Sequence, residues 1–107
     1  MIAAALILAG CGSSAPSNRE QIAAIIKQEG TRPASLCAHL TPSLLATLGG
    51  RSGCLRQAAS AVADPTTHAV SIEVRGKHAT AVEVDRNGSH TLRLVKLAGS
   101  WKLAGVK

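Results

Sequence analysis

The spacing of apolar residues changes near residue 66 and divides the chain into two halves. Before this point apolar residues recur three and four positions apart, as in Ile22, Ile25 and Ile26, which is the spacing of one helix face. After it, apolar and polar residues alternate, as in the segment 70–75, which is typical of a half-buried strand. The pattern therefore predicts an α+β domain with its helices first and its sheet second.

The helical half contains signals for the start and end of several helices. Ser17 and Glu20 have the spacing of a capping box, and Gly30 is expected to end the helix that follows. Pro33 favours the first turn of a second, short helical segment. The inward residues expected in that segment are Leu36, Cys37 and Leu40.

Two further helices are expected before residue 66. Thr41 is the predicted N-cap of one, with Pro42 in its first turn and Gly49-Gly50 at its end. Ser52 is the predicted cap of the next, which Asp64-Pro65 ends. The inward residues expected in these helices are Leu44, Leu45 and Leu48, then Leu55, Ala58, Ala59 and Val62.

The second half is predicted to form an antiparallel meander of about four strands. Gly76-Lys77 and Asn87-Gly88 are expected as two-residue hairpin turns, and residues 98–100 as a third turn. The expected strands are 70–75, 78–85, 90–97 and 101–106.

The expected turns also predict which side chains share a face of the sheet. The face expected to receive the helices carries Val70, Ile72, Val74, Ala79, Ala81, Leu92 and Leu94, with Glu83, Asp85 and His90 toward one end. The opposite face is mixed and has an apolar patch of Val82, Val84, Val95 and Leu97. A slip of one residue, as at a bulge, would invert the assignment for a strand.

The N-terminal segment has a different character from the rest of the chain. Residues 1–10 are apolar and uncharged, too short to span a membrane but suited to the end of a secretory h-region. No Lys or Arg precedes them, so we expect a signal peptide truncated at its start. Residues 12–17 are small and polar and resemble a flexible tether.

The run Leu8-Ala9-Gly10-Cys11 resembles the lipobox of bacterial lipoproteins. The resemblance implies that 1–10 is removed, that Cys11 carries acyl chains, and that residues 11–17 tether a domain over 18–107. The protein is then expected on the outer face of the cell membrane. The alternative is that 1–10 forms a buried strand or helical turn of a cytosolic protein.

Two cysteines remain if Cys11 carries lipid. Cys37 and Cys54 are expected to form a disulfide, because an exported chain meets oxidising conditions. Closing this loop with a disulfide would contribute about 3 kcal/mol to the free energy of unfolding. The alternative is two free cysteines that act as small hydrophobic residues. Cysteines this far apart with scattered histidines do not match a zinc-ligand pattern, so no metal is expected.

Charge and aromatic content bear on the partners. The net charge is +6, from twelve basic and six acidic residues, which suits contact with anionic lipid headgroups or simply a solvated face. Nucleic acid is not expected, because the basic residues are dispersed and Trp101 is the only aromatic side chain available for stacking. Trp101 is instead expected to close the sheet against the first helix.

Several segments of the chain resemble the nuclear transport factor 2-like superfamily. They are 37–44, 70–79, 92–96 and 99–103, together with Cys54. The closer resemblance is to small actinobacterial lipoproteins of that group, which are related to lumazine-binding-like domains. The resemblance covers about 18–107. It implies N-terminal helices packed on a curved antiparallel sheet of about four strands, in a cone that encloses a cavity.

This resemblance implies a domain that binds a small ligand or a protein. The side chains expected to line its pocket are Ile22, Ile26, Leu44, Leu48, Leu55, Val70, Ile72, Ala81, Leu92 and Leu94, with Glu83 as a polar contact. The alternative is that these residues fill a close-packed core.

Some proteins with the cone fold are isomerases, cyclases or dehydratases, but this chain has no Tyr and no recognisable catalytic motif. We therefore expect no catalytic residue and no cofactor.

Asp85 and His90 are expected to pair across two strands at an exposed hairpin. A structural alternative is a homodimer, or docking of an envelope protein, through the patch Val82, Val84, Val95 and Leu97.

Overall fold

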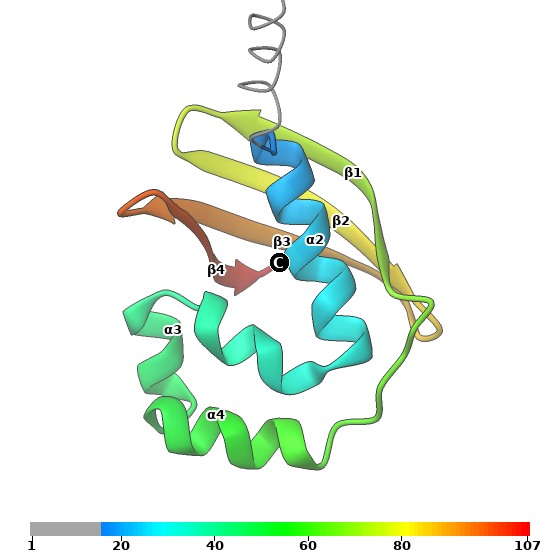
Figure 1. Ribbon diagram of the computed structural model, residues 1–107, viewed down its shortest axis with the longest axis vertical. Coiled ribbons are helices and arrows are strands. Elements are labelled where there is room, and N and C mark those ends of the chain that lie inside the picture. Colours follow the sequence, from blue (N-terminus) through cyan, green and yellow to red (C-terminus); the bar gives the residue numbers. More distant parts are fainter. Residues whose placement is uncertain (1–15) are drawn as a thin grey trace, which may run out of the picture.

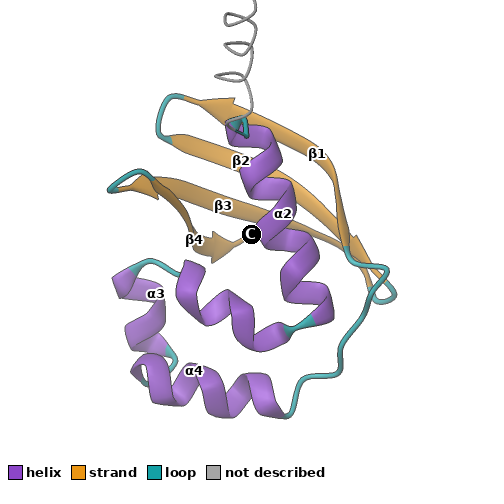
Figure 2. Ribbon diagram, in the orientation of Figure 1, coloured by secondary structure: helices purple, strands orange, loops and turns teal. Residues whose placement is uncertain are grey.

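The computed structural model describes residues 16–107, so the expected signal peptide, Cys11 and most of the tether lie outside the described residues. The chain forms helices followed by one four-stranded antiparallel sheet, which confirms the predicted α+β class (Figure 2). The helical segments are α2 (Asn18–Thr31), the 3-10 helix η1 (Pro33–His39), α3 (Pro42–Thr47) and α4 (Gly50–Ala59). The strands are β1 (His68–Arg75), β2 (His78–Asp85), β3 (Gly88–Leu97) and β4 (Ser100–Val106), in that spatial order.

The helices form two groups relative to the sheet. Figure 1 shows α2 lying across one face of the strands, with α4 at the side of the molecule far from β1 and β2. Helix α4 packs on η1 and α3. The end of η1 joins the sheet through a parallel bridge between Leu40 and Leu103. The backbone N–H of Thr41 donates to the carbonyl of Leu103 over 3.0 Å.

The core lies between α2 and the sheet. Trp101 is 1% exposed, and its indole N–H donates to Asn18 Oδ1 over 3.0 Å. Lys96 Nζ donates to the same oxygen over 2.9 Å. Trp101 therefore closes the sheet against the first helix, as predicted. The buried apolar side chains are Ile22, Ile26, Cys37, Leu40, Cys54, Ala79, Ala81, Leu92, Leu94, Trp101 and Leu103.

The predicted N-caps of α2 and α3 are confirmed. Ser17 accepts from the Glu20 backbone N–H over 3.1 Å, and the Glu20 carboxylate accepts from the Ser17 backbone N–H over 2.8 Å. Thr41 accepts from the Leu44 backbone N–H over 3.2 Å. These polar side chains satisfy N–H groups that a helix leaves without partners at its start.

Gly30 was expected to end α2, and this prediction is wrong. The helix continues to Thr31, and Gly30 is buried in its last turn. A Cβ at this position would lie 2.6 Å from the Asp64 carbonyl oxygen and 2.5 Å from Thr67 Cβ. Glycine is therefore needed for the close approach of the loop before β1 rather than for a change in helix direction.

The predicted start of α4 is also wrong. Gly49 adopts the left-handed region with φ of 89°, Gly50 begins the helix, and Ser52 lies inside it without a capping bond. Gly53 faces inward, where the Leu48 carbonyl leaves no room for a Cβ. The helix begins early because these glycines allow the reversal between α3 and α4 within two residues.

The inward face of α4 differs from the prediction. Gly53 and Cys54 are buried, whereas Leu55 and Ala59 are exposed. Val62 lies beyond the helix, which ends at Ala59, and is 80% exposed. The bond between Cys54 and Cys37 turns the Cys54 side of the helix inward, so Leu55 faces outward.

A bulge in β1 changes the predicted register of the first hairpin. The Gly76-Lys77 turn is present, with Arg75 paired to His78. Between Ala69 and Ser71 the pairing shifts by one residue, so Val70 is 56% exposed instead of facing the helices. Such a bulge inserts one unpaired residue and reverses the alternation beyond it.

The second hairpin turns one residue earlier than predicted, at Arg86-Asn87. The Asp85 carboxylate accepts from the Asn87 backbone N–H over 2.7 Å, a local bond that favours a turn at this point. Gly88 consequently pairs with Asp85, and each β2 residue pairs two positions from the predicted partner. The predicted faces are still correct, because a shift of two preserves the alternation. The last turn is Ala98-Gly99, so Ser100 belongs to β4.

Candidate functional site

A cavity of about 180 Å³ lies between α2, η1 and the sheet. Seven of its lining residues are apolar, and the two others, Glu29 and Glu83, are acidic. The apolar lining is Ile25, Ile26, Leu36, Leu92, Leu94, Leu103 and Val106.

A groove of about 330 Å³ adjoins this cavity on the side of α3 and α4. The two spaces share the walls formed by Glu29, Leu36, Leu103 and Val106. The other groove residues are Pro33, Leu40, Leu44, Leu48, Cys54, Gln57, Ala58 and Ala61. We call the cavity and the groove together the apolar pocket.

The residues expected to line the pocket lie in three places: in the pocket, in the packed core and on the surface. Ile26, Glu83, Leu92 and Leu94 line the cavity, and Leu44 and Leu48 line the groove. Ile22 and Ala81 are completely buried in the core, where Ile72 also packs. Leu55 and Val70 are exposed and lie outside the pocket, for the reasons given above.

Glu83 is the buried acidic residue of the site. It lies on β2 opposite His90, on the face that α2 covers, and is 8% exposed. Among residues 16–107, no basic side chain and no backbone N–H lies within bonding distance of the Glu83 carboxyl group. Glu29, another acidic residue, lines the same cavity and is influenced by Glu83.

Glu29 comes from the last two turns of α2 and is half-buried. Burial raises the pKa of Glu29 to about 7, and a hydrogen bond to Glu83 and the negative charges of Glu83 and Asp85 act in the same direction. The positive charge of His90 opposes them. Like charges near each other disfavour ionisation, so the neighbouring acids act together with burial to keep the pKa of Glu29 high.

Sequence reasoning did not single out Glu29, although the sequence carries a sign of it. Ile22, Ile26 and Glu29 are spaced by four and three residues, so Glu29 continues the apolar stripe of α2 toward its C-terminus. An acidic residue on an inward helix face is uncommon unless it has a partner or a function. The partner Glu83 lies more than fifty residues away in sequence, which is why the pair is visible only in the fold.

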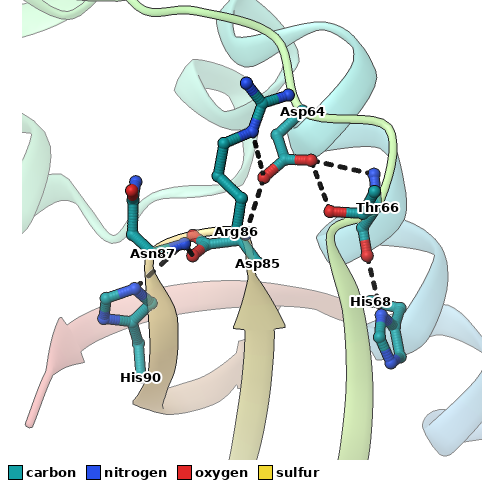
Figure 3. A network of polar contacts seen from close by, with 7 residues as sticks. All are labelled: Asp64, Thr66, His68, Asp85, Arg86, Asn87 and His90. Atoms are coloured by element: carbon teal, nitrogen blue, oxygen red, sulfur yellow. Dashed lines mark hydrogen bonds and ion pairs between the residues drawn. The ribbon is translucent and has the colours of Figure 1, made fainter.

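Asp85 and His90 form the predicted cross-strand pair, with 3.4 Å between Asp85 Oδ2 and His90 Nε2 (Figure 3). The pair is diagonal rather than directly opposite, because the hairpin turns one residue early. It lies at the hairpin end, with His90 partly open to solvent. This geometry fits the expected surface ion pair.

Asp64 ties the loop before β1 to the same hairpin. Figure 3 shows its carboxylate accepting from the backbone N–H and hydroxyl of Thr66, and contacting Arg86 through the backbone N–H at 2.9 Å and Nε at 3.3 Å. The Thr66 hydroxyl and the Arg86 N–H hold the pKa of Asp64 well below its usual range. All of these contacts are internal, so Asp64 has a structural role.

The remaining chemistry of the described residues is sparse. Residues 16–107 contain no group of three or more His, Cys, Asp or Glu side chains placed to hold a metal ion. None of the described helices is both long and apolar enough to cross a membrane. Comparison with protein-family models, with curated proteins and with solved structures finds no match to the chain.

Proposed function

We propose that the chain is a non-catalytic lipoprotein that binds a small ligand on the outer face of the bacterial cell membrane. One observation carries the binding part of this proposal: the apolar pocket adjoins the core and has two carboxyl groups in its wall. Protein interiors are close-packed by default, so an apolar space of this size next to the core needs an explanation. Ligand sites are typically apolar concavities of about 300–1,000 Å³ with a few polar groups.

The Cys37–Cys54 disulfide supports the extracytoplasmic part of the proposal. Disulfides persist in oxidising compartments and are rare in the cytosol. The location itself depends on the lipobox resemblance at Cys11. Two acyl chains on that residue would provide stable anchoring without a membrane-spanning helix.

The nuclear transport factor 2-like cone remains part of the proposal. Helices followed by an antiparallel meander, with a pocket between them, are consistent with that resemblance. The absence of Tyr from the sequence favours binding over the isomerase or dehydratase chemistry of some proteins with that fold.

Native mass spectrometry tests the binding proposal. The full chain should be isolated from its host membranes in mild detergent and sprayed under non-denaturing conditions. We expect a fraction of the protein to carry a small molecule that is lost on acid unfolding. A homogeneous protein without added mass, together with no binding of added apolar probes, would contradict the proposal.

Metabolic labelling with an alkyne fatty acid tests the anchor. We expect label on the wild-type protein and none on Cys11→Ser. The matched control is the double variant Cys37→Ser/Cys54→Ser, which retains Cys11 and should keep the label. Equal labelling of wild type and Cys11→Ser would show that Cys11 is not the lipid site.

The uncovered face of the sheet favours a second candidate function, assembly through a homodimer or an envelope protein. Val82, Val84 and Val95 are half-buried there, and Leu97 is exposed. An apolar patch with a polar border is a reasonable sign of such contact. Light scattering over a range of protein concentrations distinguishes the candidates, since only assembly makes the mass rise with concentration.

A further inference from the structure

We infer that the apolar pocket binds a primary amine with a hydrocarbon body, whose ammonium group lies between Glu29 and Glu83. The inference rests on the proposed binding function and names its ligand class. Glu29 belongs to α2 and Glu83 to β2, so the helix layer and the sheet layer each contribute one acidic residue to the lining of the cavity.

Glu83 is a buried acidic residue. Glu83 is 8% exposed as a residue, and a carboxylate held largely away from bulk water is unfavourable unless a cation or several hydrogen-bond donors compensate it. Within the described part of the chain, the group that Glu83 faces is another acid, Glu29. A bound cation would supply the compensation that the described residues do not.

The surrounding charges favour a cation over an anion or a neutral molecule. The titratable groups that face Glu29 are Glu83 and Asp85 from β2 and His90 from β3. Asp85 already pairs with His90 and the Asn87 N–H, so Glu83 is the member without a partner of opposite charge. An anion would add a negative charge to this group, and a neutral donor would leave the charge uncompensated.

An ammonium group fits two adjacent carboxyl groups for a chemical reason. It carries three N–H donors and no acceptor, so it can donate to both acids at once. Hydrogen bonds between ionised partners are roughly twice as strong as neutral ones. Binding of the ammonium favours the ionised form of Glu29, whose pKa is raised, and the proton of Glu29 leaves to solvent.

The rest of the pocket specifies a hydrocarbon body. Beyond the two acids, the cavity wall is formed entirely by aliphatic side chains, among them Leu36, Leu103 and Val106. The groove continues this lining, with Gln57 as its one uncharged polar residue. A polyamine would place a second charge against these apolar walls, so a single amine on an alkyl or alicyclic body suits the pocket better.

Thermal unfolding of the full chain in mild detergent tests the inference, read by the fluorescence of Trp101, the only tryptophan. The probes are n-butylamine, 1-butanol and butyrate at equal concentration and constant pH. We expect the amine to raise Tm by about 4–8 °C at about ten times its dissociation constant, and the other two to have little effect. Glu83→Gln and Glu29→Gln should each weaken amine binding at least tenfold.

Glu73→Gln is the matched control, because Glu73 is an exposed glutamate of β1 that pairs with Arg75. It should respond to the amine as the wild type does. A shift with butanol as large as that with the amine, or an amine shift unchanged in both pocket variants, would overturn the inference and leave the binding function standing. Failure of the amine to shift Tm would also overturn it. A bound neutral molecule in native mass spectrometry would then preserve the binding function, whereas no bound molecule would remove both proposals.

Discussion

The two structural regions of this domain are held together in different ways. The first region, α2 with the four strands, contains most of the buried apolar side chains, including the two largest that are fully buried, Trp101 and Ile22. The second region, α3 with α4, has no buried residue in α3 and only Gly53 and Cys54 in α4. Fully buried side chains stabilise the first region, whereas the second is held by a disulfide, by tight backbone approaches and by leucines that are only partly buried.

This difference explains where the pocket lies. Apolar residues of α3 and the α4 region, such as Leu44, Leu48 and Ala58, line the groove, and the two leucines are only partly buried against the core. The covalent bond to η1 allows α4 to stay in place without filling that space. The domain therefore combines a packed region with a more open one, and substitutions in the two regions should have different consequences.

The largest effect is expected for Trp101→Ala in the packed region. Removing a buried indole leaves a cavity and deletes the hydrogen bond to Asn18, at a cost of about 3–5 kcal/mol. Urea denaturation followed by circular dichroism would measure the loss. Val70→Ala is the control, because Val70 is exposed at the bulge and should change stability little. Similar values for both variants would contradict the assignment of the core.

Loss of the disulfide should affect the open region first. Cys37 and Cys54 are 17 residues apart, and removing their bond is expected to cost about 3 kcal/mol. Hydrogen exchange of Cys37→Ala/Cys54→Ala should show faster exchange in 42–59 than in β2 and β3. Uniformly faster exchange across the sheet would show that the two regions unfold as one unit.

The sequence predicted the packed region better than the open one, for physical reasons. Strand alternation and turn residues are local properties, so the four strands and the Gly76-Lys77 turn could be recognised directly. The bulge at Val70 could not be recognised from the sequence, because it depends on how β1 fits against β2 and α2. The early second turn depends on the Asp85 side chain binding the Asn87 N–H, which competes with the Asn87-Gly88 turn.

The candidate site shows the same limit. Glu83 could be placed on the inward face of β2 from alternation alone. Its pairing with Glu29 joins a helix to a strand across the fold, and no local pattern encodes such a contact. Leu55 was misplaced for a related reason, since its orientation follows from the bond that the neighbouring Cys54 makes to another helix.

Gly30→Ala tests the junction between the two regions. Alanine favours a helix by up to about 1 kcal/mol over glycine. Here, however, its Cβ would meet Thr67 and the Asp64 carbonyl, both part of the loop that links α4 to β1. We expect this crowding to prevail and to cost about 1–3 kcal/mol in urea denaturation. Lys27→Ala, at an exposed position of the same helix, should be nearly neutral, and a stabilising Gly30→Ala would refute the close approach.

The smallest effect, and the most specific, is the pH dependence that Glu29 imposes where the two regions meet. Its pKa is raised from 4.5 to about 7 in the folded protein, so folding disfavours the ionised form. The stability that the protonated group provides is complete below pH 4.5 and is lost as the pH rises through 7. We expect the wild type to lose about 1–2 kcal/mol between pH 4.5 and 8, since partial exposure of Glu29 reduces the effect.

Glu29→Gln should abolish most of this loss, because glutamine stays neutral throughout. The variant should therefore be more stable than the wild type at pH 8 and similar to it near pH 4.5, in urea denaturation at the two pH values. Measurements should stay above pH 4.5, because Asp64, whose pKa is lowered, loses its contribution in more acidic solution. Glu73→Gln, on the opposite side of the sheet, should keep the wild-type profile. If Glu29→Gln and wild type lose stability in parallel, the pH dependence does not come from Glu29.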